Sequence, residues 1–269
     1  MTKFSVLMSL YKNESPNNLM ASLESLNRQT LRPTEIILVL DGPIGESLKK
    51  VIELWIDVLN IISVQIDKNV GLGRALNYGL GFCNYDLVAR MDTDDICLTT
   101  RFEKQIQEFI YDDSLALIGT AIQEFDGDIN NIVGTRAVPE SPSEILNFAK
   151  YKNPFNHMTV IFKKSVVQKV GGYKHHHFME DYNLWLRIIS NGYKTKNLQE
   201  VLLLARTGNA MILRRKGLTY IKSEYQLARL KYSLGIQNIF QAAYVGIIRS
   251  LPRIMPAKIL FYIYKYSRK

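Results

Sequence analysis

Short apolar runs alternate with amphipathic stretches over the first hundred residues of the chain. Four runs have the length of buried strands: residues 4–10, 36–40, 61–66 and 87–91. Three stretches with helical periodicity lie between them: residues 17–28, 45–59 and 72–82. This alternation predicts βαβ units, and therefore an α/β fold with a mostly parallel central sheet. Ligands of such sheets bind at the carboxyl ends of the strands, so the residues that follow each run are the first candidates for a site.

The pattern continues less regularly beyond residue 95. The predicted elements are a helix at 100–111, a strand at 115–122, a helix after 139–143, an extended segment at 157–163, a helix at 179–191 and a strand at 198–206. A shift in composition near Met211 then divides the chain. We predict a catalytic domain at 1–210 and a helical, basic region at 211–269.

The net charge of +9 belongs to the C-terminal region. Residues 214–269 contain 12 Lys or Arg and one acid, Glu224, whereas residues 1–213 contain 22 basic and 24 acidic residues. The tail cations alternate with apolar residues, which predicts two or three short amphipathic helices interrupted by Pro252 and Pro256. The cations expected to face an anionic leaflet are Arg214, Arg215, Lys216, Lys222, Arg229, Lys231, Arg249, Arg253, Lys258 and Lys265. Because the tail lacks a nucleic-acid-binding signature, a membrane surface is the expected partner and nucleic acid is not. The alternative is a set of ordinary helices that pack against the catalytic domain and expose a basic face.

Two further observations bear on location. The first apolar run is followed by polar residues without a small-residue cleavage site, so it is interpreted as a strand. The two cysteines, Cys83 and Cys97, fit a reducing compartment, and no stretch approaches the roughly 18 apolar residues of a spanning helix. The sequence thus predicts a cytoplasmic protein that is peripheral on the inner face of the cell membrane.

An acidic cluster follows the fourth run. Asp92, Asp94 and Asp95 place three carboxylates within four positions, and such a cluster repels itself unless a cation lies among the oxygens. We predict a divalent metal, Mn²⁺ or Mg²⁺, on Asp92 and Asp94, with a substrate diphosphate completing its coordination. A solvated acidic turn is the alternative for the tetrapeptide taken alone.

Other candidates for the diphosphate-bearing substrate lie near the ends of the first three runs. Ser9 lies near the end of the first run, and Asp41 follows the second and can accept hydrogen bonds from a base or ribose. The segment Asn69–Arg74, with Gly71 inside it, precedes a helix and can offer backbone amides and a guanidinium to phosphate. Its glycines could equally serve only the turn.

Five short motifs follow one another along residues 3–206. They are Ser25-Leu-Asn-Arg-Gln-Thr30 with Pro33-Thr-Glu-Ile-Ile37 and Asp41-Gly42; Asn69-Val-Gly-Leu-Gly-Arg74 with Asn77; Arg90-Met-Asp-Thr-Asp-Asp95 with Arg101; Gly171-Gly-Tyr173; and Glu180-Asp-Tyr-Asn-Leu-Trp185. Together they resemble the motif series of family 2 glycosyltransferases with the GT-A fold. Within that family the chain looks most like bacterial O-antigen and exopolysaccharide transferases.

The resemblance implies roles for individual residues. Asp41 would contact the nucleotide base, Arg74 the base or diphosphate, Asp92 the ribose or metal, and Asp94 the metal. Arg101 belongs to the same nucleotide-binding set. The base that deprotonates the acceptor would be Asp181. No Gln-x-x-Arg-Trp motif follows, unlike in processive members, so the enzyme should add one sugar and release its product.

The acceptor side is less sharply marked. His157, Glu180 and Trp185 are weak candidates for acceptor contacts, although a lone histidine is as often structural and Trp185 has the character of a core residue. The run His175–His177 suggests a mobile acceptor-side loop, with a solvated surface loop as the alternative.

The chemistry of these residues agrees with inverting transfer of one sugar from a nucleotide sugar to a lipid-diphosphate-linked saccharide. UDP-galactose is the expected donor, although none of these residues distinguishes one hexose from another. A nucleotidyltransferase acting on sugar phosphates is an alternative, but 10–14 lacks the glycine-rich signature expected there. A non-catalytic basic adaptor is a second alternative, which leaves Asp92, Asp94 and Asp181 without a role.

Overall fold

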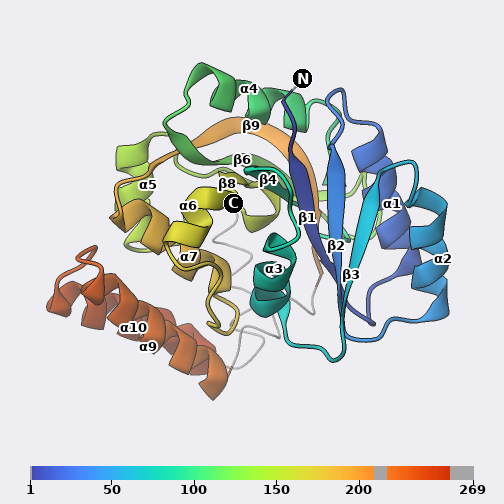
Figure 1. The fold of residues 1–269 in the computed structure, drawn as a ribbon. Helices are drawn as coiled ribbons and strands as arrows, with labels where there is room; N and C mark the ends of the chain where they lie inside the picture. Colours follow the sequence, from blue (N-terminus) through green and yellow to red (C-terminus); the bar gives the residue numbers. More distant parts are fainter. Residues whose placement is uncertain (1, 209–216, 255–269) are drawn as a thin grey trace.

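The computed structural model describes residues 2–208 and 217–254. The first half of the chain alternates strand and helix as predicted (Figure 1). Its elements are β1 (Ser5–Leu10), α1 (Pro16–Asn27), β2 (Glu35–Asp41), α2 (Glu46–Trp55), β3 (Ile61–Ile66), α3 (Leu72–Leu80) and β4 (Leu87–Arg90). The four strands are parallel, in the order β3-β2-β1-β4. Continuous apolar runs form these strands because β1 and β2 are covered by helices on both faces.

The second half extends the same sheet. Its elements are β5 (Ile96–Cys97), α4 (Arg101–Tyr111), β6 (Leu115–Phe125), β7 (Ile132–Arg136), α5 (Pro142–Ala149), the 3₁₀ turn η1 (His157–Thr159), β8 (Ile161–Lys163), α6 (Lys164–Lys169), α7 (Glu180–Ser190) and β9 (Lys194–Arg206). The full order is β3-β2-β1-β4-β8-β6-β9-β5, with β7 beside β6. The β6–β9 pair is parallel, whereas β8 runs antiparallel to both β4 and β6. The sheet is therefore mixed, with its parallel strands concentrated in the N-terminal half.

One predicted segment begins differently. The extended segment expected at 157–163 starts as the η1 turn, and only its last three residues join the sheet. The turn forms because the backbone N–H and the hydroxyl of Thr159 both donate to the carbonyl oxygen of Asn156, at 2.9 and 2.8 Å. This turn places His157 before the start of β8 instead of within a strand.

The sheet lies between two layers of helices. One core packs α1, α2 and α4 on the first face, through residues such as Leu23, Val51 and Phe102. The other core packs α3, α6 and α7 on the opposite face, where Trp185 is fully buried. Figure 1 shows α1 and α2 on one side of the strands and α3, α6 and α7 on the other.

Two helices form a hairpin beyond the sheet. The α9 helix (Leu218–Ser233) packs against α7, and the α10 helix (Ile239–Ile254) lies beside α9 (Figure 1). Pro252 does not interrupt α10, since it lies in the last turn and removes one backbone donor only. Pro256 and the predicted boundary near Met211 fall outside the described residues. Across 2–208 and 217–254, no helix has both the length and the hydropathy needed to cross a bilayer.

Candidate active site

The carboxyl end of β2 holds the loop before α3. The side chain of Asp41 is buried and accepts hydrogen bonds from the Val70 N–H at 2.7 Å, the Gly71 N–H at 3.1 Å and the Asn69 side-chain amide at 2.9 Å. Gly42 adopts a φ of 88°, and a Cβ there would lie 2.8 Å from the backbone nitrogen of Asn69. The structure thus brings Asp41, Asn69 and Gly71 together, and Asp41 shapes the loop in addition to its predicted nucleotide contact.

The acidic loop lies at the carboxyl end of β4. Ligand oxygens of Asp92, Asp94 and Asp95 all lie within 4.8 Å of one another. Burial and the neighbouring charges of Asp92 and Glu14 raise the pKa of Asp94 to about 7. Burial also raises the pKa of Asp95 well above its usual range, and its Oδ2 is buried without a partner among the described atoms. Three crowded carboxylates with one orphaned oxygen suit a hard divalent cation, which adds Asp95 to the predicted pair.

Two buried arginines support this loop from behind. The Arg90 guanidinium pairs with the Asp92 carboxylate and donates to the Met91 carbonyl. Arg101 is fully buried and donates to the Arg90 carbonyl at 2.7 Å and to Gln105 at 3.1 Å. Arg101 therefore lies under the acidic loop, where it can shape the nucleotide site without reaching the ligand.

A cavity of about 400 Å³ opens between α3 and α7. It is lined by Gly71, Leu72, Gly73 and Arg74 from the start of α3, by Val70 and His157, by 175–178, and by Glu180 and Asp181 from the start of α7. The two helix starts lie close together. A Cβ added to Gly73 would lie 2.8 Å from the Cβ of Glu180. The cavity thus joins predicted nucleotide-binding residues to the predicted base. Ser9, half-buried near the end of β1, does not line it.

The two acids at the start of α7 have different surroundings. Burial raises the pKa of Glu180 to about 7, and its Oε2 has no partner among the described atoms. Asp181 accepts a hydrogen bond at its Oδ2 from the Asn153 side-chain amide, at 2.7 Å. Asn153 was not among the predicted residues, because a partner 28 positions away leaves no local signal. This amide fixes the orientation of the Asp181 carboxylate beside the cavity.

The remaining acceptor-side candidates separate into lining and core residues. His157 lines the cavity, and its Nε2 lies 3.2 Å from the Tyr173 hydroxyl. Burial lowers the pKa of His157 to about 4, with a smaller effect of Arg90 in the same direction, so the ring is neutral near pH 7. Trp185 is fully buried against Phe155 and Tyr173, which places it behind His157 and away from an acceptor.

The histidine run is anchored at its centre. His176 is buried, and its Nε2 lies 2.8 Å from the Ser223 carbonyl oxygen of α9, while His175 and His177 are exposed. The loop that lines the cavity is therefore attached to the helical hairpin, which differs from the solvated loop considered above. The anchor lies 47 positions along the chain, beyond the reach of a local pattern.

Sequence comparisons give a consistent result. The profile of the family described as "Glycosyl transferase family 2" matches residues 5–171. The amylovoran biosynthesis glycosyltransferase AmsE of Erwinia amylovora is 48% identical over 266 residues, which are 99% of each chain. The UDP-Gal:alpha-D-GlcNAc-diphosphoundecaprenol beta-1,3-galactosyltransferase of Escherichia coli is 37% identical over 268 residues, covering 98% of this chain and 95% of its own.

Solved structures share the fold. S. aureus TarS 1–349 in complex with UDP-GlcNAc superposes with a TM-score of 0.68 at 18% identity, over 94% of this chain and 74% of its own. Mannosyltransferase PcManGT from Pyrobaculum calidifontis, in complex with GDP-Man and Mn²⁺, gives 0.64 at 15% identity, over 97% and 79%. At these identities the likeness establishes the architecture alone.

Proposed function

The chain belongs to glycosyl transferase family 2 and has the GT-A fold, and from that membership we propose that it transfers one galactosyl residue from UDP-galactose, with inversion, to a lipid-diphosphate-linked saccharide. The full-length similarity to the galactosyltransferase of E. coli, whose name states both UDP-Gal and a diphosphoundecaprenol acceptor, supports this donor and acceptor. The place in metabolism is surface polysaccharide synthesis of the exopolysaccharide or O-antigen kind. Because the chain belongs to this family, neither a nucleotidyltransferase nor a non-catalytic adaptor is needed to explain its candidate site residues.

One observation carries the reaction type. The cavity has the start of α3 on one side and the Asp181 carboxylate on the other. An inverting displacement needs a base on the attacking side and positive charge on the leaving side. Asp41, whose carboxylate accepts from the Val70 and Gly71 N–H groups, would contact the nucleotide base, and Arg74 would contact the base or the diphosphate. A Mn²⁺ or Mg²⁺ ion on the aspartates of the acidic loop, when bound, would neutralise charge on the leaving diphosphate.

The residues of α7 would act on the acceptor. Asn153 holds Oδ2 of Asp181, which leaves Oδ1 to take the proton of the attacking hydroxyl. Neutral His157 offers a ring nitrogen that can hydrogen-bond an acceptor hydroxyl without adding charge. Glu180, whose pKa is about 7, is half protonated near neutrality and could hydrogen-bond the donor sugar or the acceptor.

The proposed location is the inner face of the cell membrane, with peripheral attachment through the C-terminal region. A lipid-diphosphate acceptor would be presented there. The helices of the described chain do not span a bilayer, so attachment would use surface contacts.

A donor screen tests this function. The purified protein is incubated with UDP-galactose, UDP-glucose, UDP-GlcNAc or GDP-mannose and a GlcNAc-diphosphate-lipid acceptor, and nucleoside diphosphate release is measured with and without EDTA. We expect release with UDP-galactose only in the presence of Mn²⁺ or Mg²⁺ and acceptor. Turnover with another donor would replace galactose, and full turnover in excess chelator would remove the metal.

A further inference from the structure

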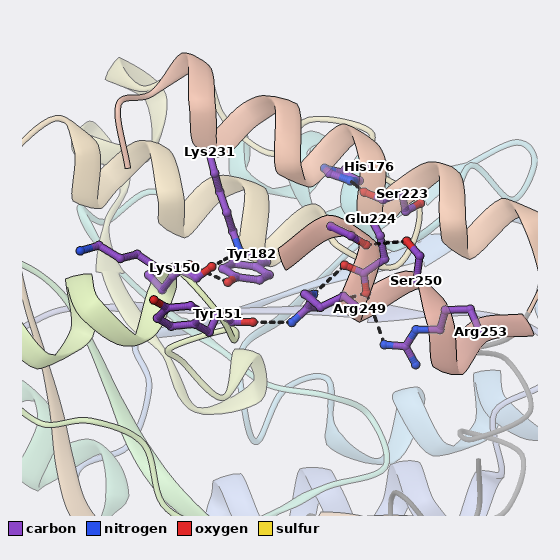
Figure 2. Close-up of polar contacts among 12 residues, drawn as sticks. Lys150, Tyr151, His176, Tyr182, Ser223, Glu224, Lys231, Arg249, Ser250 and Arg253 are labelled. Atoms are coloured by element: carbon purple, nitrogen blue, oxygen red, sulfur yellow. Dashed lines mark hydrogen bonds and ion pairs between the residues drawn. The ribbon is translucent and has the colours of Figure 1, made fainter. Parts of the chain in front are cut away.

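The inner face of the α9–α10 hairpin is occupied by internal polar contacts (Figure 2). Lys231 is buried, and its ammonium donates to the Lys150 carbonyl at 2.8 Å and lies over the Tyr182 ring. Arg249 donates to the Glu224 carboxylate at 2.6 Å and to the Tyr151 carbonyl at 2.6 Å. These cations, expected from the sequence to face a leaflet, instead attach the hairpin to the catalytic domain.

A third cation has the same orientation. Arg253 is buried and lies 3.3 Å from Glu224, which is itself only 1% exposed. Figure 2 shows Arg249 and Arg253 converging on this carboxylate from α10. These ion pairs neutralise the negative charge of Glu224, which is the one acidic residue between residues 217 and 254.

The outer face of the hairpin is apolar. Its exposed side chains include Tyr225 and Phe240, which are 70% and 83% exposed, together with Tyr244 and Ile247. A groove of about 570 Å³ separates the two helices on this face. The helices approach closely at Gly246, where a Cβ would lie 3.2 Å from that of Ala228, so the larger side chains project outward around the groove.

Charge distinguishes among possible occupants of this face. Of the ionisable side chains of 217–254 other than tyrosines, only Lys222 and Arg229 are exposed, and both are positive. A second copy would bring like charges together, which opposes self-association through the same face. An anionic leaflet offers opposite charge to the lysine and arginine, an interface that tyrosines favour and a hydrocarbon layer for Phe240 and Ile247.

We propose that the outer face of the α9–α10 hairpin, formed by Tyr225, Tyr232, Phe240, Tyr244, Ile247 and Leu251, docks on an anionic lipid bilayer. This inference rests on the proposed lipid-linked acceptor and names the surface that meets its membrane. The inner face of the hairpin contacts the catalytic domain at two places that adjoin Asp181, namely His176 and the segment 150–151 that precedes Asn153. Docking therefore holds the acceptor side of the cavity close to the lipid headgroups.

Vesicle binding tests the surface. The full-length protein and a Phe240→Ser, Tyr244→Ser, Ile247→Ser variant are sedimented with phosphatidylcholine vesicles that do or do not contain phosphatidylglycerol. A matched control replaces two exposed apolar residues distant from the hairpin, Leu54→Ser and Tyr111→Ser, which are 65% and 79% exposed. We expect partitioning onto anionic vesicles to fall about tenfold or more in the hairpin variant and to change less than about twofold in the control.

The readout separates this inference from the enzymatic function. Binding needs no turnover, and thermal unfolding with circular dichroism establishes that each variant is folded. Wild-type partitioning by the hairpin variant would overturn the proposal, as would a failure of the wild type to bind anionic vesicles. Light scattering that shows a wild-type dimer, converted to a monomer by the hairpin substitutions, would assign the face to self-association and would also overturn it.

Discussion

Replacement of Asp181 by Asn isolates the proposed proton transfer. The asparagine keeps the volume of the side chain and one oxygen that can accept the Asn153 amide hydrogen bond, at present 2.7 Å long. It removes the charge that would take the acceptor proton. We therefore expect Asp181→Asn to lose transfer activity while the cavity keeps its shape.

The two effects of this substitution differ in size. Loss of a general base costs about 10²–10⁴-fold in rate, or about 2.7–5.5 kcal/mol of activation free energy. Exchange of a charge-assisted hydrogen bond for a neutral one costs about 1 kcal/mol of stability at most. For a chain of this size that corresponds to a fall in Tm of about 2–4 °C.

The assay measures nucleoside diphosphate release with saturating donor. Isothermal titration calorimetry gives the donor affinity of each variant, and scanning calorimetry gives its Tm. Glu180→Gln is the matched control, because it neutralises the adjacent carboxyl group in the same turn. We expect donor affinity to stay within about threefold for Asp181→Asn. Retention of more than about a tenth of the wild-type rate would refute the assignment, and a larger loss in Glu180→Gln would move the base to Glu180.

Three other changes have expected outcomes. Asp94→Ala should abolish metal-dependent activity and weaken Mn²⁺ binding by at least about tenfold in calorimetric titration, since it removes a central carboxylate of the cluster. Glu224→Gln should lower the free energy of unfolding by about 3 kcal/mol in denaturant titration, because it leaves the buried Arg253 and the half-buried Arg249 without their counter-charge; an unchanged midpoint would contradict this. Burial lowers the pKa of Lys231 to about 7, whereas the unfolded chain keeps this proton to about pH 10.5, so the buried amine contributes stability that rises with pH between these values. Lys231→Met should flatten that part of the Tm–pH profile, and a parallel profile would argue against the shift.

The parallel half of the fold could be predicted because its determinants are local. Runs such as 36–40 are apolar throughout, and only strands covered on both faces need that pattern. The antiparallel partner β8 could not be placed in the sheet from the sequence. Its three residues, Ile161–Lys163, acquire their position from pairing with β4 and β6, each more than forty residues distant.

The candidate site divides in the same way. The segments at Asp41 and at Asp92–Asp95 follow strand ends, so topology alone predicts that they converge. The roles of Asn153 and His176 depend on hydrogen bonds to residues 28 and 47 positions away, and a local sequence pattern does not reveal such contacts. Similarly, helical spacing predicts that each tail helix has an apolar and a polar face, but the inward orientation of Arg249 depends on Glu224 and the Tyr151 carbonyl.

The hydrogen bonds that the segment after α5 accepts have a consequence for folding during translation. The carbonyl groups of Lys150 and Tyr151 receive their donors from Lys231 and Arg249, the latter 98 positions later in the chain. On the ribosome, the parallel strands can pair while these donors have yet to be translated. We expect nascent chains arrested at residue 236 to resist protease across β1–β4 and to be cleaved near Asn153, with resistance there appearing only after residue 249 has left the exit tunnel. The strands that carry Asp41 and Asp92 would thus form before the segment that positions Asp181 is fixed.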